Sequence, residues 1–167
     1  MTQDDFFGGE HQWLGTMRKN WRKAIEGDGA ICPCCDRKGK VYPIKLNKTY
    51  ACAVAWIMVN GDAEGWVNVQ KKGPRWMLAG KNYGMLTHWG LIESAGTRSG
   101  IWRATLKGRD FVRGLTTVPS AVFIYDDRVW GFEDKQTTFS ECIKNRFDFD
   151  EMMNTRFDWS NVMGRFK

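Results

Sequence analysis

Apolar residues change their spacing along the chain, and each spacing predicts a type of element. In residues 11–25 they recur every three or four positions, which gathers them on one face of a helix and leaves basic side chains on the other. Residues 48–59 show a second helical pattern, and Asn47 before them is a residue type that caps helices. The first part of the chain is therefore predicted to contain two helices.

Shorter apolar runs predict strands. Four segments show such runs: 40–46, 66–69, 121–125 and 129–132. Pro43 restricts the first of them to a sheet edge, because proline has no N–H to give to a neighbouring strand. The last two are separated by a short polar turn and predict a hairpin. Thr138 is a candidate cap for a final helix that ends near residue 147.

The middle of the chain combines both patterns. Pro74 opens a short predicted helix that ends near Gly80, and Asn82 is a candidate cap for a second that ends at Trp89. The remaining elements follow in the order strand, polar loop, strand and helix: 91–93, 94–100, 101–106 and 107–113. This order is the layout of a winged helix-turn-helix, with the loop as the wing.

These elements predict an α+β protein in three parts. Residues 1–46 form a basic helix and a cysteine-rich turn, residues 47–117 a winged-helix domain, and residues 118–167 a hairpin, a helix and a tail. A chain of 167 residues with nine tryptophans has enough apolar material for a core. Most tryptophans lie on apolar faces, which favours burial over stacking on single-stranded nucleic acid.

Positive charge is concentrated in the middle of the chain. Residues 31–50 carry five Lys and Arg against one acidic residue, and residues 51–120 carry nine against four. Both ends of the chain are slightly acidic. This distribution suits a surface that binds phosphates, and it is equally what a solvated basic face would show.

Two sequence segments resemble the winged-helix domains of bacterial and phage regulators. They are HWGLIE, from His88, and GIWRATLKGRDFVRG, from Gly100, within a similarity that extends over residues 66–114. The segment CPCCDRKGKVYPIKLN, from Cys32, resembles small, mostly uncharacterised phage proteins. The resemblance implies that the second helix of the pair enters the major groove of DNA and that the wing lies on the backbone or in the minor groove.

Carried over by position, the resemblance implies a set of DNA-binding residues. Those on the second helix are Lys81, Asn82, Met85, Thr87 and His88. Those on the wing are Thr97, Arg98 and Ser99. Phosphate contacts are expected from Lys71, Lys72 and Arg75, with Arg103 as a secondary candidate. Asn82 has the side chain that pairs with adenine, whereas Leu86 and Trp89 are expected to point into the core.

The expected function is therefore binding of double-stranded DNA, as a phage or mobile-element transcriptional regulator in the cytoplasm of a bacterial host cell. The alternative is an inhibitor or adaptor that uses the same surface to dock on a host protein complex. No catalytic motif is visible in the sequence, so the chain is not expected to be an enzyme. A monomer is the default expectation.

The cysteines predict a metal half-site. Cys32 and Cys35 form a C-x-x-C pair, which can present two thiolates to one zinc ion. A structural zinc site needs four ligands, and Cys52 and His11 are the candidates for the other two. The alternative is a packed turn with reduced thiols and no cofactor. Five cysteines, an odd number, favour a reducing compartment over a disulfide framework.

Overall fold

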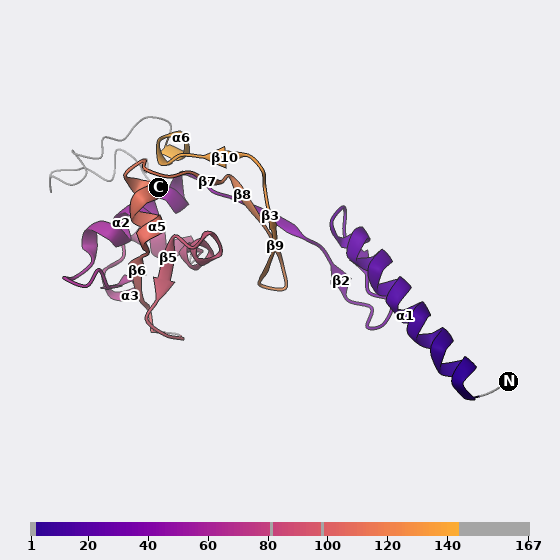
Figure 1. Cartoon of the computed structure of the whole chain (residues 1–167). Coiled ribbons are helices and arrows are strands. Elements are labelled where there is room, and N and C mark those ends of the chain that lie inside the picture. Colours follow the sequence, from indigo (N-terminus) through magenta and orange to yellow (C-terminus); the bar gives the residue numbers. More distant parts are fainter. Residues whose placement is uncertain (1–2, 81, 98, 144–167) are drawn as a thin grey trace. The chain divides into compact units, whose positions relative to one another are not determined.

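The computed structural model describes residues 3–80, 82–97 and 99–143, and their side chains from residue 13 onward (Figure 1). It is a mixed α+β structure with several small sheets. The chain forms two compact units: Met1–Ile44 with Phe123–Gly131, and Lys45–Val122 with Phe132–Lys167. Each unit is described by itself. Within the described ranges, none of the helices combines the length and the apolar character that crossing a membrane requires.

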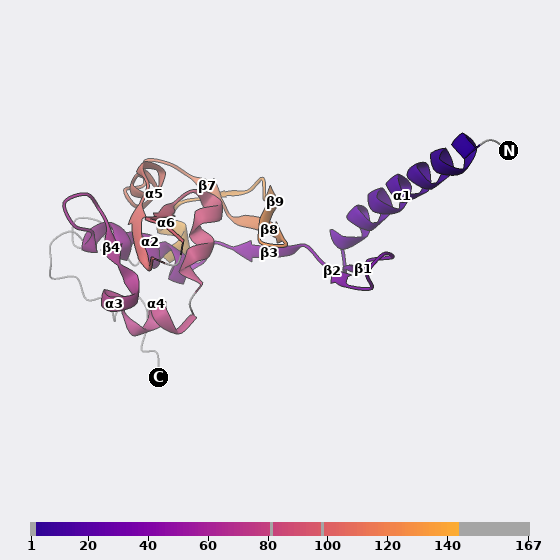
Figure 2. The ribbon, with the colours of Figure 1, turned by 90° about the horizontal axis from the view of Figure 1, so that it is seen from below.

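The first unit begins with a long helix and a hairpin (Figure 2), and it also includes Phe123–Gly131. Helix α1 (Gln3–Ile25) begins well before the predicted start at His11 and ends where predicted. Strands β1 (Ala30–Ile31) and β2 (Lys38–Gly39) pair in antiparallel fashion on either side of the cysteine turn. The Val41 N–H donates to the Ile25 carbonyl over 2.8 Å, which ties the end of the hairpin to the end of the helix.

Half-buried aromatic side chains pack together in the first unit. The rings of Trp21 and Tyr125 meet edge to face with centroids 5.8 Å apart, and Tyr125 meets Trp130 in the same way at 5.8 Å. The Arg22 guanidinium lies 5.3 Å from the centroid of the Trp130 ring, and Trp130 Nε1 donates to Glu26 Oε1 over 3.0 Å. These tryptophans are therefore engaged within the protein, as their apolar spacing predicts.

A three-stranded sheet has the order β3–β8–β9. Its strands are β3 (Tyr42–Lys45), β8 (Ala121–Tyr125) and β9 (Arg128–Phe132). Strand β3 lies at the edge, which confirms the prediction from Pro43. Asp126 and Asp127, between β8 and β9, have φ of 50° and 56°. Two successive positive φ angles are typical of tight hairpin turns, so the predicted hairpin is also confirmed.

The second unit is built around α2 (Lys48–Asn60). Asn47 caps this helix as predicted, because its side-chain oxygen accepts the Tyr50 N–H over 3.0 Å. Every residue from Ala51 to Ile57 is buried. A helix that is apolar on all sides lies in the interior of a domain, so α2 is the central element of this unit.

A second three-stranded sheet has the order β4–β6–β5, and β6 is antiparallel to both neighbours. Its strands are β4 (Val67–Asn68), β5 (Ile92–Ser94) and β6 (Ile101–Ala104). The helices that follow β4 are α3 (Val69–Lys72), α4 (Arg75–Gly80) and the 3₁₀ helix η1 (Tyr83–Trp89) (Figure 2). Helix α5 (Leu106–Val112) follows β6.

The predicted strand 66–69 is only partly correct. It is limited to Val67–Asn68, because the Asn68 side chain accepts the Lys71 N–H over 3.0 Å and so caps a helix that begins at Val69.

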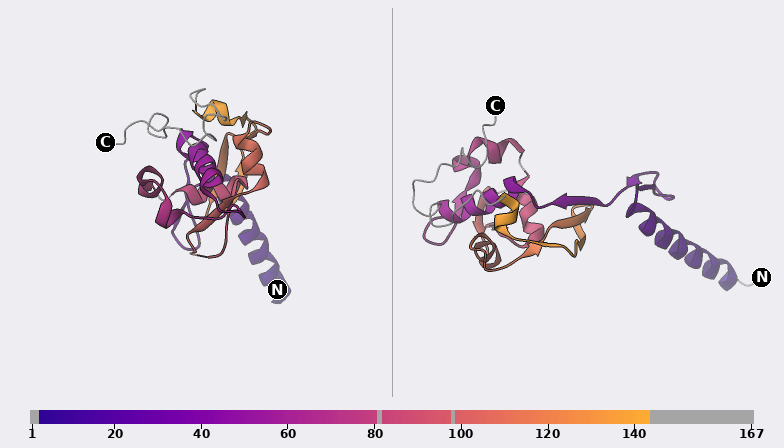
Figure 3. Two further views of the ribbon diagram at one scale, coloured as in Figure 1. Left: turned by 90° about the vertical axis from the view of Figure 1, so that its left-hand side faces the viewer. Right: turned by 90° about the horizontal axis from the view of Figure 1, so that it is seen from above.

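The last described elements close the second unit. Strands β7 (Val118–Pro119) and β10 (Gln136–Thr137) pair in antiparallel fashion, and α6 (Phe139–Ile143) follows. Thr138 caps α6 as predicted: Thr138 Oγ1 accepts the Glu141 N–H, and Glu141 Oε2 accepts the Thr138 N–H. The Phe111 and Phe139 rings lie 5.8 Å apart, which places α5 next to α6 (Figure 3). The predicted end near residue 147 lies outside the described residues.

Candidate nucleic-acid interface

The junction between η1 and β5 is held by side chains from the start of α5. Gly90 ends η1 in the left-handed conformation, with φ of 69°. The Thr105 hydroxyl donates to the Gly90 carbonyl over 2.6 Å, and Lys107 Nζ donates to the Trp89 carbonyl over 2.8 Å. Carbonyls at the end of a helix lack partners within it, so these two side chains satisfy them.

Backbone packing completes this junction. The Thr105 N–H donates to the Leu91 carbonyl over 3.1 Å, and Thr105 Oγ1 also accepts the Gly108 N–H over 3.0 Å. A Cβ added at Gly108 would lie 2.0 Å from the Leu91 carbonyl oxygen, so only glycine fits there. We call Thr105, Lys107 and Gly108 the α5 clamp. The Thr–x–Lys–Gly part of GIWRATLKGRDFVRG thus orients η1 relative to the sheet.

The 3₁₀ helix η1 is the segment predicted to read bases. Leu86 and Trp89 are buried, as predicted, and Trp89 Nε1 donates to the Pro119 carbonyl over 2.8 Å. Asn82 does not cap this helix: its own backbone is helical and its side chain makes no capping hydrogen bond, whereas a cap residue needs an extended backbone. Seven residues in 3₁₀ geometry also present a narrower face than an α-helix would.

The predicted base-reading residues differ in exposure. Asn82 and Thr87 are exposed, whereas Met85 and His88 are half-buried. Thr87 Oγ1 donates to the Gly84 carbonyl over 2.8 Å, so its hydroxyl hydrogen already has an acceptor within the protein. Lys81 lies outside the described residues. Among the described candidates on η1 and just before it, Asn82 is thus the exposed side chain best suited to a base contact.

The loop between β5 and β6 is the segment predicted to form the wing, and we call it the wing. Ser94 Oγ donates to the Gly96 carbonyl over 2.7 Å, and Ser99 Oγ accepts the Ile101 N–H over 3.2 Å. The two serine hydroxyls lie 3.4 Å apart, so Ser99 helps to hold the base of the wing. Thr97 is exposed on the loop, and Arg98 is not among the described residues.

Helix α3 lies against the base of the wing. The Val69 N–H donates to the Gly100 carbonyl over 2.9 Å, and a Cβ added at Gly100 would lie 2.9 Å from Gln70 Cδ. Lys71 and Lys72, the next two residues, are exposed in the last turn of α3. Arg75, the third residue predicted to contact phosphate, begins the separate helix α4 and is itself exposed.

Arg103 is already engaged within the domain. Its Nε lies 2.5 Å from Glu93 Oε1, across the β5–β6 register, and its guanidinium lies 4.3 Å from the centroid of the Trp66 ring. In contrast, Lys71, Lys72 and Arg75 form no ion pair with any described residue. Among the described candidates for phosphate contacts, those on α3 and α4 are therefore exposed and unpaired, whereas Arg103 on the middle strand is engaged.

The cysteine pair Cys32–Cys35 lies in the first unit, in the turn between β1 and β2. Cys52, a predicted third ligand, is fully buried in α2 of the second unit. Over the part of the chain that the structure describes, no group of three or more His, Cys, Asp or Glu residues is arranged to hold a metal ion. The side chain of His11 is not described.

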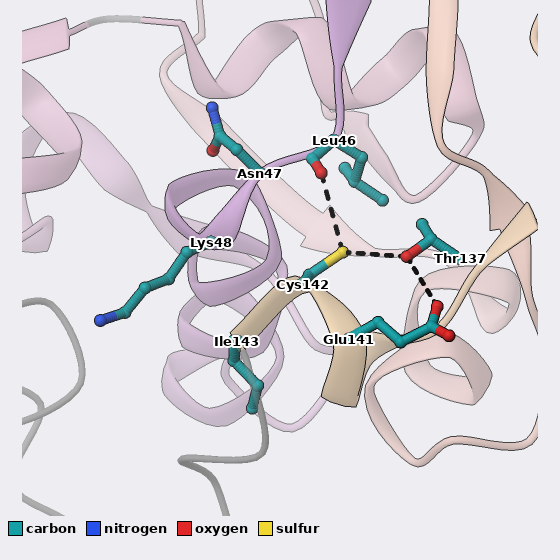
Figure 4. Close-up of a pocket in the computed structure, with 7 residues that line it drawn as sticks. All are labelled: Leu46, Asn47, Lys48, Thr137, Glu141, Cys142 and Ile143. Carbon is teal, nitrogen blue, oxygen red and sulfur yellow. Dashed lines mark hydrogen bonds between the residues drawn. The ribbon is translucent and has the colours of Figure 1, made fainter.

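Sequence reasoning did not single out a pocket of about 510 Å³ beside α6 (Figure 4). Within it, Cys142 Sγ donates to the Leu46 carbonyl over 3.8 Å and lies 3.7 Å from Thr137 Oγ1, which donates to Glu141 Oε2 over 3.0 Å. The Thr138 N–H and then the Thr137 hydroxyl lower the pKa of Glu141, whereas burial raises the pKa of Cys142. The thiol therefore stays protonated and is a weak nucleophile.

Cys52 is expected to resist thiol reagents in the folded protein. Burial raises the pKa of Cys52 to about 12, whereas Cys34 and Cys35 are exposed. Only the thiolate is a strong nucleophile, so iodoacetamide at mildly alkaline pH should label the exposed pair first. Peptide mapping by mass spectrometry should show labelling of Cys52 only after denaturant is added. Equally rapid labelling of Cys52 and Cys34 under native conditions would contradict this burial.

Comparison with known proteins gives no match: no family model, no curated protein and no solved structure is significantly similar to the chain.

Proposed function

We propose that the second unit is a winged-helix domain. The support is its order of elements: α2, then β4, a run of short helices that ends in η1, and the β5–β6 hairpin with its wing. The strand order β4–β6–β5 places the hairpin beside the first strand, as in winged helices. The α5 clamp accounts physically for the sequence segments that carry the resemblance.

We further propose that this domain binds the phosphate backbone of double-stranded DNA. The observation that carries this proposal is the contact between Gln70 and Gly100, which joins α3 to the wing and so brings Lys71 and Lys72 beside it. Exposed cations without ion pairs can neutralise phosphates without first breaking an interaction within the protein. Base reading by η1 has less support, because Asn82 and Thr87 are the exposed base-reading candidates among the described residues.

We also propose transcriptional regulation of a phage or mobile element as its role, which needs a sequence preference in addition to backbone binding. Backbone contacts give affinity and register, whereas sequence preference needs base contacts or DNA deformation. The proposed domain therefore binds many duplexes with similar affinity, and Asn82 supplies modest selectivity for adenine.

The experiment that tests this proposal is a fluorescence-anisotropy titration of labelled random duplex at several salt concentrations. We expect binding at low salt and a log–log slope of about −3 or steeper, because each neutralised phosphate contributes about −0.9 to the slope. A single-stranded oligonucleotide of the same length serves as the control and should bind more weakly. Undetectable duplex binding at low salt would refute the proposal.

The second candidate function is a protein-docking adaptor. It is favoured by two exposed leucines, Leu106 at the start of α5 and Leu115 three residues after its end, which are 74% and 72% exposed. Apolar side chains in water are a feature of protein-binding surfaces. An adaptor would not bind duplex DNA in the same titration, so one measurement separates the two functions.

A further inference from the structure

Three helices of the second unit border a second, smaller pocket of about 160 Å³. Its lining comes from the first two turns of α2, from α4 and from the start of η1. The buried side chains of Ala53 and Met77 give it an apolar base. Pockets for drug-sized ligands have roughly 300–1,000 Å³, so this one has the size for a single ring system.

Aromatic rings form much of the lining. Tyr50, Trp76 and Tyr83 are all half-buried there. The Tyr50 ring lies 6.2 Å from the Trp89 ring, centroid to centroid, and the Tyr83 ring meets the Trp102 ring edge to face at 5.6 Å. Both tyrosines are therefore held in place by rings outside the pocket, which lowers the entropy cost of binding a ligand between them. Trp76 has no such ring neighbour among the described residues, so its face can stack on a ligand.

Two carboxamides lie at the exposed side of the pocket, those of Asn47 and Asn82. Asn47 Oδ1 accepts the Tyr50 N–H, which leaves Nδ2 as a donor. The Asn82 side chain makes no capping hydrogen bond, so it offers a donor and an acceptor side by side. An amide of this kind pairs with the edge of a nucleobase, where a donor also lies beside an acceptor.

The described lining carries no formal charge. It contains no Lys, Arg, His, Asp or Glu, although the chain has 25 Lys and Arg. A phosphate or carboxylate placed there would lose its water without gaining an opposite charge, which costs free energy. Aromatic faces and amide edges instead suit a flat, neutral heterocycle, because its faces stack while its edge forms hydrogen bonds.

We propose that this pocket binds a free nucleobase or its nucleoside, stacked on Trp76 and hydrogen-bonded to Asn47 and Asn82. The base enters from the side where both carboxamides are exposed. The volume holds the base alone, so the sugar of a nucleoside remains in solvent. The ligand and its contacts involve no phosphate, so this proposal does not rest on the DNA binding proposed for the same unit.

The test is isothermal titration calorimetry of the full-length chain with adenine and with adenosine. Adenine is the probe because its edge carries the N6 donor beside the N7 acceptor. We expect one binding site per chain for each of the two ligands. Cyclohexanecarboxamide is the control ligand: it is neutral and has an amide but no flat ring, so it should not bind detectably.

Two variants test the two kinds of contact. Trp76→Ala should weaken adenine binding by at least about tenfold, as expected for the loss of a stacked ring. Its matched control is Trp13→Ala, which removes a 65% exposed tryptophan of the first unit and should leave the affinity unchanged. Asn47→Asp preserves the cap of α2, because aspartate caps as well as asparagine, but it replaces the Nδ2 donor by a charged acceptor. This variant should also weaken adenine binding about tenfold.

Thermal unfolding establishes that each variant is folded, and Asn47→Asp carries the test alone if Trp76→Ala is not. Absence of adenine binding at millimolar concentration would overturn the proposal, as would equal binding of cyclohexanecarboxamide or unchanged affinity in the folded variants. Tighter binding of a short oligodeoxyadenylate that requires Trp76 would also overturn it, because the ligand would then be a nucleic-acid strand. Duplex DNA is absent from these titrations, so their outcome is independent of the test of duplex binding.

Discussion

Gly108→Ala is expected to destabilise the second unit by about 3 kcal/mol, at the upper end of the cost of overpacking. The added Cβ would lie 2.0 Å from the Leu91 carbonyl oxygen, which is backbone and cannot rotate away. Relief requires α5 to move, and that movement stretches the bonds from Thr105 to Gly90 and from Lys107 to Trp89. Thermal unfolding followed by tryptophan fluorescence should show a midpoint lower by roughly 10 °C or more.

Gly80→Ala is the matched control for this substitution. Gly80 ends α4 in the same unit, and a Cβ added there meets no atom within 4 Å. Alanine is a better helix former than glycine, so the control should change the free energy of unfolding by less than about 1 kcal/mol, in the stabilising direction. If Gly108→Ala unfolds at the same temperature as this control, the α5 clamp does not hold η1 as described.

Elements governed by local rules were predictable from the sequence. Asn47 and Thr138 cap helices, Pro43 marks an edge strand, and the two aspartates between β8 and β9 make a tight turn. The caps and the turn act on atoms no more than a few positions away in the chain, and Pro43 acts through its own missing N–H. Their outcome therefore depends little on the rest of the fold.

The incorrect predictions of helix caps have a different physical origin. Asn82 precedes a helical pattern just as Asn47 does, but its own backbone is helical, so its side chain does not cap. Asn68 lies in β4, as predicted, but it also caps α3, a role that the predicted strand 66–69 did not include. Whether Asn68 or Asn82 caps a helix depends on how η1 and α3 pack against the sheet. The local spacing of apolar residues gives no information about that packing.

The strands and the loop of the candidate site were predictable from the sequence, whereas the contacts of their side chains were not. The polar loop separates two apolar runs, yet the pairing of Arg103 with Glu93 depends on the β5–β6 register. That register explains why a cation on β6 is engaged within the protein. Likewise, Cys52 has a side chain of the type that binds zinc, but it is fully buried in α2. The free cations of α3 and α4 consequently become the principal candidates for binding phosphates.

The double charge reversal Lys71→Glu/Lys72→Glu is expected to lower affinity for random duplex on the order of 100-fold, since each charged interaction contributes at least about 1.4 kcal/mol, a factor of ten. The log–log salt slope should become shallower by about two, one for each phosphate that the lysines no longer neutralise. Both lysines are exposed and lack ion pairs with described residues, so the free energy of unfolding should change by less than about 0.5 kcal/mol.

A charge-matched control separates a local interaction from a change in total charge. Lys45 and Lys135 are exposed residues of the same unit, at the edge strand β3 and just before β10, away from Gln70 and Gly100 in sequence. Lys45→Glu/Lys135→Glu alters the net charge by the same amount but leaves every proposed phosphate-binding residue in place. Its salt slope should therefore equal that of the unaltered protein. Equal reductions of affinity in the two double variants would mean that general electrostatic attraction, not α3 beside the wing, holds the duplex.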